Sequence, residues 1–193
     1  IRTGLRSTTV PSTVATLGWM LQRYGNLPLD VVLQPALEAA SEGFRVSALH
    51  HRLIKREAKH LVNDPLASSL LLPGGQPLTA GQMLRQPQLA ACLELLASQG
   101  WKEFYLGEIG EHIIRDMQDR DGLLSRADLS QIPFPQERPV LQGTYRKRRL
   151  VTFPPPGAGR ALVQIMNILE TFEPGELDPS SPDAAVILAH VFM

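Results

Sequence analysis

The chain has 193 residues, 44% of them hydrophobic, and its formal net charge is zero. This is enough for one compact domain with a buried core, and the charge balance argues against a nucleic-acid-binding protein, which needs a basic surplus on one face. No apolar run is long enough to span a membrane. The single cysteine, Cys92, excludes an internal disulfide and leaves the redox compartment open.

The first part of the chain predicts amphipathic helices with clear ends. A helix should run from near Pro11 to Gly25, residue types that favour a helix start and a helix stop. Its apolar stripe is formed by Val14, Leu17, Leu21 and Tyr24. A second helix should end at Gly43 and be kinked by Pro35, and Ser47 can cap a third.

The middle of the chain is expected to begin with a loop at 63–81. The clearest helix of the sequence follows at 88–99, and Gly100 ends it. Another helix should stop at Gly122.

Late in the chain, Val140–Leu141 and Leu150–Phe153 predict short strands. A helix is expected over 162–172, and a last one begins near Asp183. The predicted fold class is therefore mostly α with a small β element.

The segment "FPPPGAGR", which ends with Gly157-Ala158-Gly159-Arg160, stands between a predicted strand and a predicted helix, as phosphate-binding loops do. A P-loop, however, needs G-x-x-x-x-G-K-[ST], and the dinucleotide fingerprint needs a third glycine where Leu162 stands. The three prolines also remove N–H donors that such a loop would use. We interpret the segment as a connection in which small residues permit close packing.

Four consecutive basic residues, Arg146–Arg149, follow Tyr145 and could form a site for a phosphate or an acidic partner. The chain is neutral, and no further aromatic residue is interleaved with them. We therefore favour a solvated hairpin tip beside buried Leu150 and Phe153.

"MQDRDGLLSRAD" resembles a calcium-binding loop, with Asp119 and Asp121 at the third and fifth positions. Met117 would then occupy the first position and Asp128 the twelfth, where an oxygen ligand and Glu are required. A turn followed by a helix that starts at Ser125 is the better interpretation.

The remaining candidate residues are histidines and the cysteine. His50 and His51 are adjacent, so they point in different directions on a helix, and with His60 they form no i, i+4 pair; we expect surface histidines. Cys92 lies on an apolar helical stripe without a basic neighbour and is expected to be a core residue. We therefore predict no catalytic, cofactor-binding or metal-ligating residue among these 193.

Three blocks in one order resemble the γ-glutamyltranspeptidase family of N-terminal-nucleophile hydrolases. They are "TVPSTVATLGWMLQRYG" with its continuation to "EGFRV", "LTAGQML" with its continuation to "RADLSQI", and "YRKRRLVTFPPPGAGRALVQIMNILETF". The resemblance covers nearly the whole chain. Three motifs depart from the family's V-P-G, Y-R-G and S-S-G-G: Val10-Pro11-Ser12, Tyr145-Arg146-Lys147 and Gly157-Ala158-Gly159-Arg160.

The resemblance implies a precursor that cuts itself into a large and a small subunit, which together form a four-layer αββα sandwich. Residues 1–193 would be a helical, scaffolding portion of the large subunit. The threonine nucleophile, its oxyanion and substrate residues and the arginine for the substrate carboxylate would lie outside it, so we expect this chain alone to be inactive. Its partners would be the rest of the large subunit and the small subunit, with self-association as a further possibility.

The implied activity is transfer of a γ-glutamyl group from a glutathione-type donor to water or an amino acid, without a cofactor. Two alternatives stay open: a related acylase or poly-γ-glutamate-processing amide hydrolase, and a diverged, non-catalytic homologue. A periplasmic or secreted location is consistent with the family, although no secretory signal is visible.

The chain begins at Ile1 and ends in the apolar run that starts at Ala184, so we expect a fragment. If the family architecture holds, the helices that carry Val14 and Leu89 lack partners and expose apolar surface.

Overall fold

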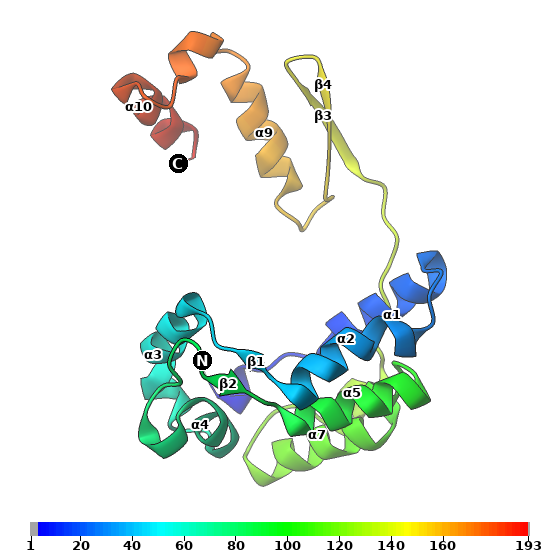
Figure 1. Cartoon of the computed structure of the whole chain (residues 1–193). Coiled ribbons are helices and arrows are strands. Elements are labelled where there is room, and N and C mark those ends of the chain that lie inside the picture. Colours follow the sequence, from blue (N-terminus) through cyan, green and yellow to red (C-terminus); the bar gives the residue numbers. More distant parts are fainter. Residues whose placement is uncertain (1–3, 193) are drawn as a thin grey trace. The chain divides into compact units, whose positions relative to one another are not determined.

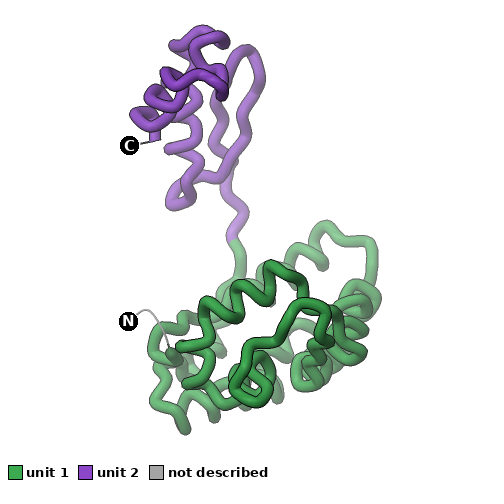
Figure 2. Tube along the Cα trace, turned by 60° about the vertical axis from the view of Figure 1, so that its left-hand side comes forward, with its two compact units in different colours: residues 1–135 green, residues 136–193 purple. Residues whose placement is uncertain are grey.

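The structure is a computed structural model that describes residues 4–192. The chain divides after Pro135 into two compact units, shown in different colours in Figure 2. Each unit consists mainly of helices and one two-stranded antiparallel sheet, which confirms a mostly α fold with a small β element. Among residues 4–192, no helix is long and apolar enough to cross a bilayer.

The first unit holds most of the helices (Figure 1). Its α-helices are α1 (Thr13–Tyr24), α2 (Leu29–Glu42), α3 (Ala48–Leu61), α4 (Pro65–Leu71), α5 (Pro87–Gln99), α6 (Glu103–Leu106), α7 (Glu108–Asp119) and α8 (Arg126–Ser130). Its shorter elements are η1 (Leu5–Ser7), β1 (Phe44–Arg45), η2 (Pro73–Gly75) and β2 (Met83–Leu84). The helix α2 continues through Pro35 to Glu42, and α7 ends three residues before Gly122.

One core of this unit lies where α1, α6, α7 and α8 meet around Trp101 and Tyr105. Its other buried members are Ala15, Ile114, Met117, Leu124 and Leu129. The Trp101 ring contacts the rings of Tyr105 and Phe134 edge to face, with centroids 6.4 and 5.8 Å apart. Beside this core, α2 packs along α5 (Figure 1).

A second core is formed by α3, α4 and the small sheet. Its buried members are Val46, Ile54, Leu72, Leu78 and Leu84. The strands β1 and β2 are antiparallel, with Phe44 opposite Leu84. The predicted cap of α3 is confirmed, because the Ser47 hydroxyl accepts the His50 N–H at 3.1 Å.

The predicted loop at 63–81 is wrong, because it contains α4 and η2. Asp64 caps α4, with its carboxylate accepting the Ala67 N–H at 2.9 Å, and Pro65 occupies the first turn. The helix has only seven residues, so no apolar periodicity revealed it. The Asp64-Pro65 pair was the available signal.

The second unit contains the hairpin β3 (Leu141–Tyr145) and β4 (Arg148–Thr152), the helix α9 (Gly159–Leu169), η3 (Pro174–Leu177) and α10 (Pro182–Val191). The register runs from Leu141 opposite Thr152 to Tyr145 opposite Arg148. Gly143 of β3 lies against α9, because a Cβ there would be 2.9 Å from Val163 Cγ1.

The predicted strand positions are shifted relative to β3 and β4. Val140 precedes β3, and Phe153 follows β4. The expected burial beside the hairpin is wrong: Leu150 is only half-buried, and 76% of Phe153 is exposed.

Candidate functional site

The glycine loop before α9 serves packing. A Cβ on Gly159 would lie 2.0 Å from the Phe153 carbonyl oxygen, so only glycine permits the first turn of α9 to approach β4 this closely. The Gly157 N–H already donates to the Pro154 carbonyl at 3.0 Å. The structure therefore supports the interpretation of "FPPPGAGR" as a tight strand-to-helix connection, and Arg160 is exposed on α9.

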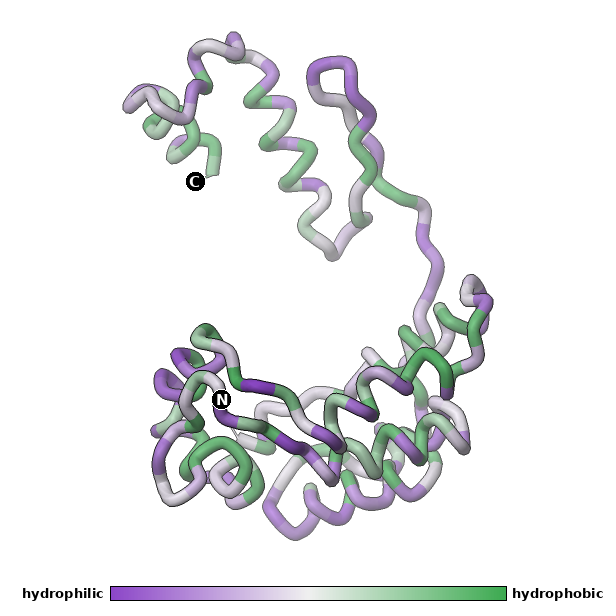
Figure 3. Tube along the Cα trace, viewed as in Figure 1, coloured by the Kyte–Doolittle hydropathy of each residue, from purple (hydrophilic) through white to green (hydrophobic). Residues whose placement is uncertain are grey.

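The basic run lies at the tip of the β3–β4 hairpin, which Figure 3 shows as a hydrophilic segment. Arg146 and Lys147 both have positive φ, 47° and 64°. Arg146 is half-buried and held to the end of α9: its N–H donates to Glu170 Oε1 at 2.8 Å, and its guanidinium donates to the Phe172 carbonyl at 3.3 Å. The solvated tip is thus confirmed for Lys147, Arg148 and Arg149, whereas Arg146 has a structural role.

Two carboxylates of the calcium-like segment have separate structural partners. Asp121 pairs with Arg6 at 2.8 Å. Asp128 completes a capping box with Ser125, which confirms the predicted helix start. Hydrogen bonds from the Ser125 hydroxyl and then its N–H lower the pKa of Asp128. Across residues 4–192, no three metal-binding side chains cluster.

The histidines are less exposed than predicted. Of the three considered above, His50 and His51 are half-buried and His60 is exposed. The His50 ring stacks on Phe44 with centroids 6.2 Å apart, and His51 Nδ1 lies 2.8 Å from the Leu78 carbonyl. The two rings therefore help to hold α3 against β1 and against the segment that contains Leu78. Cys92, which we expected to be a core residue, is half-buried on α5.

An apolar groove of about 570 Å³ lies between α1, α2 and α5. None of the residues that line it is charged. The groove exposes large apolar side chains, and the exposed fraction is 59% for Leu17, 47% for Met20, 63% for Tyr24 and 44% for Val32. The predicted exposure of apolar surface on α1 is therefore present, and Leu89 of α5 is also 44% exposed.

Trp101 forms part of the groove wall and was not identified from the sequence. Its ring lies on α1 because Gly18 has no side chain: a Cβ there would be 2.2 Å from Trp101 Cγ. Trp101 is 95% buried, with 5% of its surface exposed, yet its Nε1–H has no hydrogen-bond partner among residues 4–192. Gly18 within the predicted apolar stripe was the one sequence signal for this contact.

Tyr105 fixes the start of α1, which forms one side of the groove. Its hydroxyl donates to the Pro11 carbonyl at 2.7 Å and accepts the Ala15 N–H at 3.0 Å. Ser12, at the N-cap position, makes no side-chain cap, so Tyr105 supplies it from a distant part of the chain. Burial raises the pKa of Tyr105, opposed by the Ala15 hydrogen bond.

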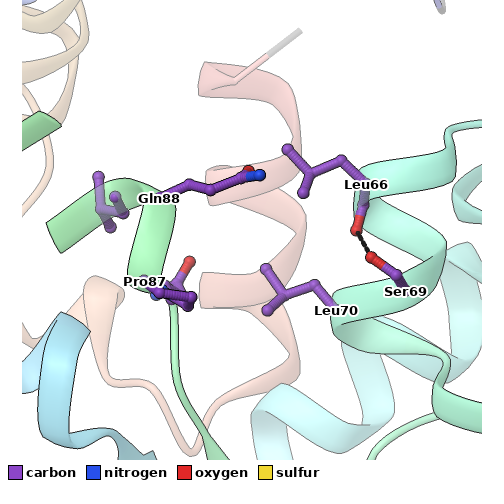
Figure 4. A pocket seen from close by; sticks show the side chains of 7 residues that line it. Leu66, Ser69, Leu70, Pro87 and Gln88 are labelled. Atoms are coloured by element: carbon purple, nitrogen blue, oxygen red, sulfur yellow. Dashed lines mark hydrogen bonds between the residues drawn. The ribbon is translucent and has the colours of Figure 1, made fainter. Parts of the chain in front are cut away.

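A smaller cavity of about 320 Å³ lies between α4 and the start of α5 (Figure 4). Leu66, Leu70 and Pro87 line it, together with uncharged polar side chains. Its Ser69 hydroxyl donates to the Leu66 carbonyl at 2.9 Å, as the dashed line in Figure 4 shows. The cavity therefore offers no activated nucleophile, since no base lines it.

Known proteins resemble this chain over nearly its full length. The family model described as gamma-glutamyltranspeptidase matches residues 1–192. The chain is 39% identical to an acylase ACY 1 proenzyme of Pseudomonas sp. (strain V22), covering 96% of this chain and 33% of that protein. It is 38% identical to the glutathione hydrolase proenzyme of Escherichia coli (strain K12), covering 93% of this chain and 31% of that protein.

A solved structure agrees with these relatives. The γ-glutamyltranspeptidase of Helicobacter pylori superposes with a TM-score of 0.90 at 26% identity, over 97% of this chain and 54% of that one. The chain spans about a third of the length of the curated relatives named above. The match over residues 1–192, together with these relatives, shows that the chain belongs to the γ-glutamyltranspeptidase family.

Proposed function

We propose that the complete protein, of which this chain is a part, transfers or hydrolyses γ-glutamyl groups. The observation that carries the proposal is the family match over residues 1–192, together with 38% identity to a glutathione hydrolase proenzyme. The donor would be a glutathione-type compound, and the acceptor would be water or an amino acid.

The chemistry would take place at an N-terminal threonine released when the precursor cuts itself. The α-amino group of this threonine takes the hydroxyl proton, and the oxygen attacks the γ-glutamyl carbonyl. The protonated α-amino group passes that proton to the donor nitrogen as the bond to it breaks, so the donor leaves as a neutral amine and an ester to the enzyme forms. Water or an amino group then attacks the ester, which restores the hydroxyl. This threonine lies outside residues 1–193.

Residues 1–193 would act as a scaffold in this reaction. Their helices would cover the sheets of a four-layer αββα sandwich and support the active-site cleft. The described side chains agree with a supporting role, since the glycine loop, Tyr105, Asp128 and the half-buried histidines all make packing or capping contacts. The purified 193-residue chain should therefore release no product from a γ-glutamyl anilide, and measurable release would contradict this role.

A second candidate is an acylase of the same fold. It is favoured by the 39% identity to an acylase ACY 1 proenzyme. A poly-γ-glutamate-processing hydrolase is a related alternative. A diverged homologue without the threonine would have no activity.

A substrate panel on the full-length protein separates these candidates. Glutathione, a glutaryl amide and poly-γ-glutamate are compared at equal concentration, with a variant in which the threonine is replaced by alanine as control. Threonine-dependent turnover of glutathione above the other two supports the proposal. Preference for the glutaryl amide shows the acylase, and no turnover of any substrate contradicts both.

A further inference from the structure

The turn between β3 and β4 carries basic residues at positions that favour other residue types. Arg146 and Lys147 form the turn, with φ values of 47° and 64°. A two-residue hairpin turn with both φ values positive usually contains Asn-Gly or a similar pair, because long side chains are strained there. The family motif Y-R-G also has glycine where Lys147 stands. This chain therefore keeps a lysine at the turn at a cost to stability, as functional positions often do.

Arg146 holds the turn in place and leaves the next three side chains in water. Its guanidinium donates to the Phe172 carbonyl at 3.3 Å and lies over the Tyr145 ring, 5.1 Å from the ring centroid. Residues 147–149, which we call the basic tip, are all exposed (Figure 3). Within the described part of the chain, none of these three side chains forms an ion pair. The tip therefore presents three unpaired positive charges.

Within the described hairpin, no carboxylate stands opposite the basic tip. The register places Tyr145 opposite Arg148 and Thr144 opposite Arg149, and both partners are uncharged. Facing residues of opposite charge would neutralise each other, and here they do not. The tip is thus a local positive surplus in a chain whose net charge is zero, and it attracts anionic groups.

The arrangement of the tip charges favours a flexible partner over a flat one. Arg148 and Arg149 are successive residues of one strand, so their side chains leave opposite faces of the hairpin. A bilayer or a stiff duplex meets one face, whereas a flexible chain bends around the hairpin end. Glu170 accepts the Arg146 N–H at 2.8 Å, so a carboxylate lies at the base of the tip. Its charge repels a broad anionic surface more than a narrow segment that contacts only the tip.

We propose that the basic tip is a docking site for a flexible acidic segment, rich in Asp or Glu, of a partner protein. The guanidinium groups of Arg148 and Arg149 each match a carboxylate through two parallel hydrogen bonds, and Lys147 adds a point charge. The segment binds by charge complementarity and needs no apolar pocket. The tip takes no part in the bond-making steps of the γ-glutamyl transfer, so this inference does not depend on the proposed function.

Fluorescence anisotropy of the full-length protein with a labelled polyaspartate peptide tests the docking at physiological ionic strength. Aspartate contains no γ-glutamyl group, so substrate binding at the reaction site is not measured. The tip variant removes all three charges through Lys147→Gln, Arg148→Gln and Arg149→Gln. The control removes the same charge from exposed positions of α3, namely Arg52→Gln, Lys55→Gln and Lys59→Gln.

The dissociation constant should rise about tenfold or more in the tip variant and less than about threefold in the α3 control. Each exposed ion pair contributes little, but several that engage one segment act together. Arg148→Lys with Arg149→Lys keeps the charge and should retain most of the binding, whereas a misfolded hairpin would lose it. Equal losses in the tip variant and the α3 control would overturn the proposal, because total charge would then set the affinity. Failure of the unchanged protein to bind the peptide would overturn it as well.

Vesicles that contain an anionic phospholipid and a DNA duplex test the other kinds of partner. Both are titrated under the same conditions as the peptide. Weaker binding of both than of the peptide supports an acidic segment. Tighter binding of either one, lost in the tip variant, would overturn the acidic segment as the partner of the tip.

Discussion

Replacing Tyr105 with phenylalanine tests how the start of α1 is fixed. The substitution keeps the ring, which contacts Trp101 and Phe104 with centroids 6.4 and 5.1 Å apart. It removes only the hydroxyl that donates to the Pro11 carbonyl and accepts the Ala15 N–H. The change in stability therefore reports these two hydrogen bonds with little cavity formation.

The magnitude follows from the burial of the groups left behind. Ala15 is fully buried, so water cannot replace the lost acceptor of its N–H. An unpaired buried amide costs about 1–3 kcal/mol, and loss of a helix N-cap costs about 1 kcal/mol in other proteins. We expect Tyr105→Phe to lower the free energy of unfolding by about 2 kcal/mol.

Urea unfolding followed by circular dichroism measures this loss. With an m-value of about 2 kcal/mol/M, the midpoint should fall by about 1 M. Tyr24→Phe is the matched control, because its side chain is 63% exposed, and it should change stability by less than about 0.5 kcal/mol.

The loss of stability at alkaline pH provides a second test of the role of Tyr105. Because burial raises the pKa of Tyr105, the unfolded chain loses this proton first as pH rises. The stabilisation is fully present below the ordinary tyrosine pKa of about 10 and is lost as pH rises through the raised folded value. The Tyr105→Phe variant has no hydroxyl to ionise, so its free energy of unfolding should fall less at alkaline pH than that of the wild type. Equal stability of Tyr105→Phe and Tyr24→Phe at neutral pH would refute the capping role.

Three further substitutions test local features. Gly159→Ala should destabilise by about 1–3 kcal/mol, because its Cβ would lie 2.0 Å from the Phe153 carbonyl oxygen; Gly175→Ala, with no atom within 4 Å, should be nearly neutral in the same urea titration. Lys147→Gly should raise the free energy of unfolding by about 0.5–1 kcal/mol, since lysine holds φ at 64°, and an unchanged urea midpoint would contradict strain there. Asp64→Ala should cost about 1 kcal/mol at pH 7. The hydrogen bond from the Ala67 N–H and, after it, the one from Arg120 lower the pKa of Asp64. The stabilisation from Asp64 is therefore present above the ordinary aspartate pKa and is lost as pH falls through the lowered pKa of the folded state. A stability difference between Asp64→Ala and wild type that does not change with pH would argue against the cap.

Local rules predicted several helix ends well. The Ser47 cap, the Gly100 stop of α5 and the start of α8 at Ser125 follow from side-chain and backbone preferences within a few residues of each helix end. The apolar stripe of α1 also placed Leu17 and Tyr24 on one side of the helix. For these elements, neighbouring residues contain the needed information.

The predictions failed where the decisive partner is distant in sequence or the element is short. The Tyr105 cap of α1 spans 90 residues, and the Trp101 contact with Gly18 joins two segments that no local pattern connects. Periodicity also says nothing about what covers a stripe, so Phe153 was expected to be buried although it is exposed. The family resemblance rested on motif order and did not depend on these contacts.

The central claim concerns the reaction of the complete protein, and covalent trapping tests it most directly. Full-length protein is incubated with a γ-glutamyl anilide, quenched in acid and digested, and its peptides are weighed by mass spectrometry. The account predicts a self-cleaved chain whose new N-terminal threonine carries one γ-glutamyl group, and an alanine variant of that threonine without it. An uncleaved chain, or a cleaved chain whose N-terminal peptide never gains this mass during turnover, would contradict the account.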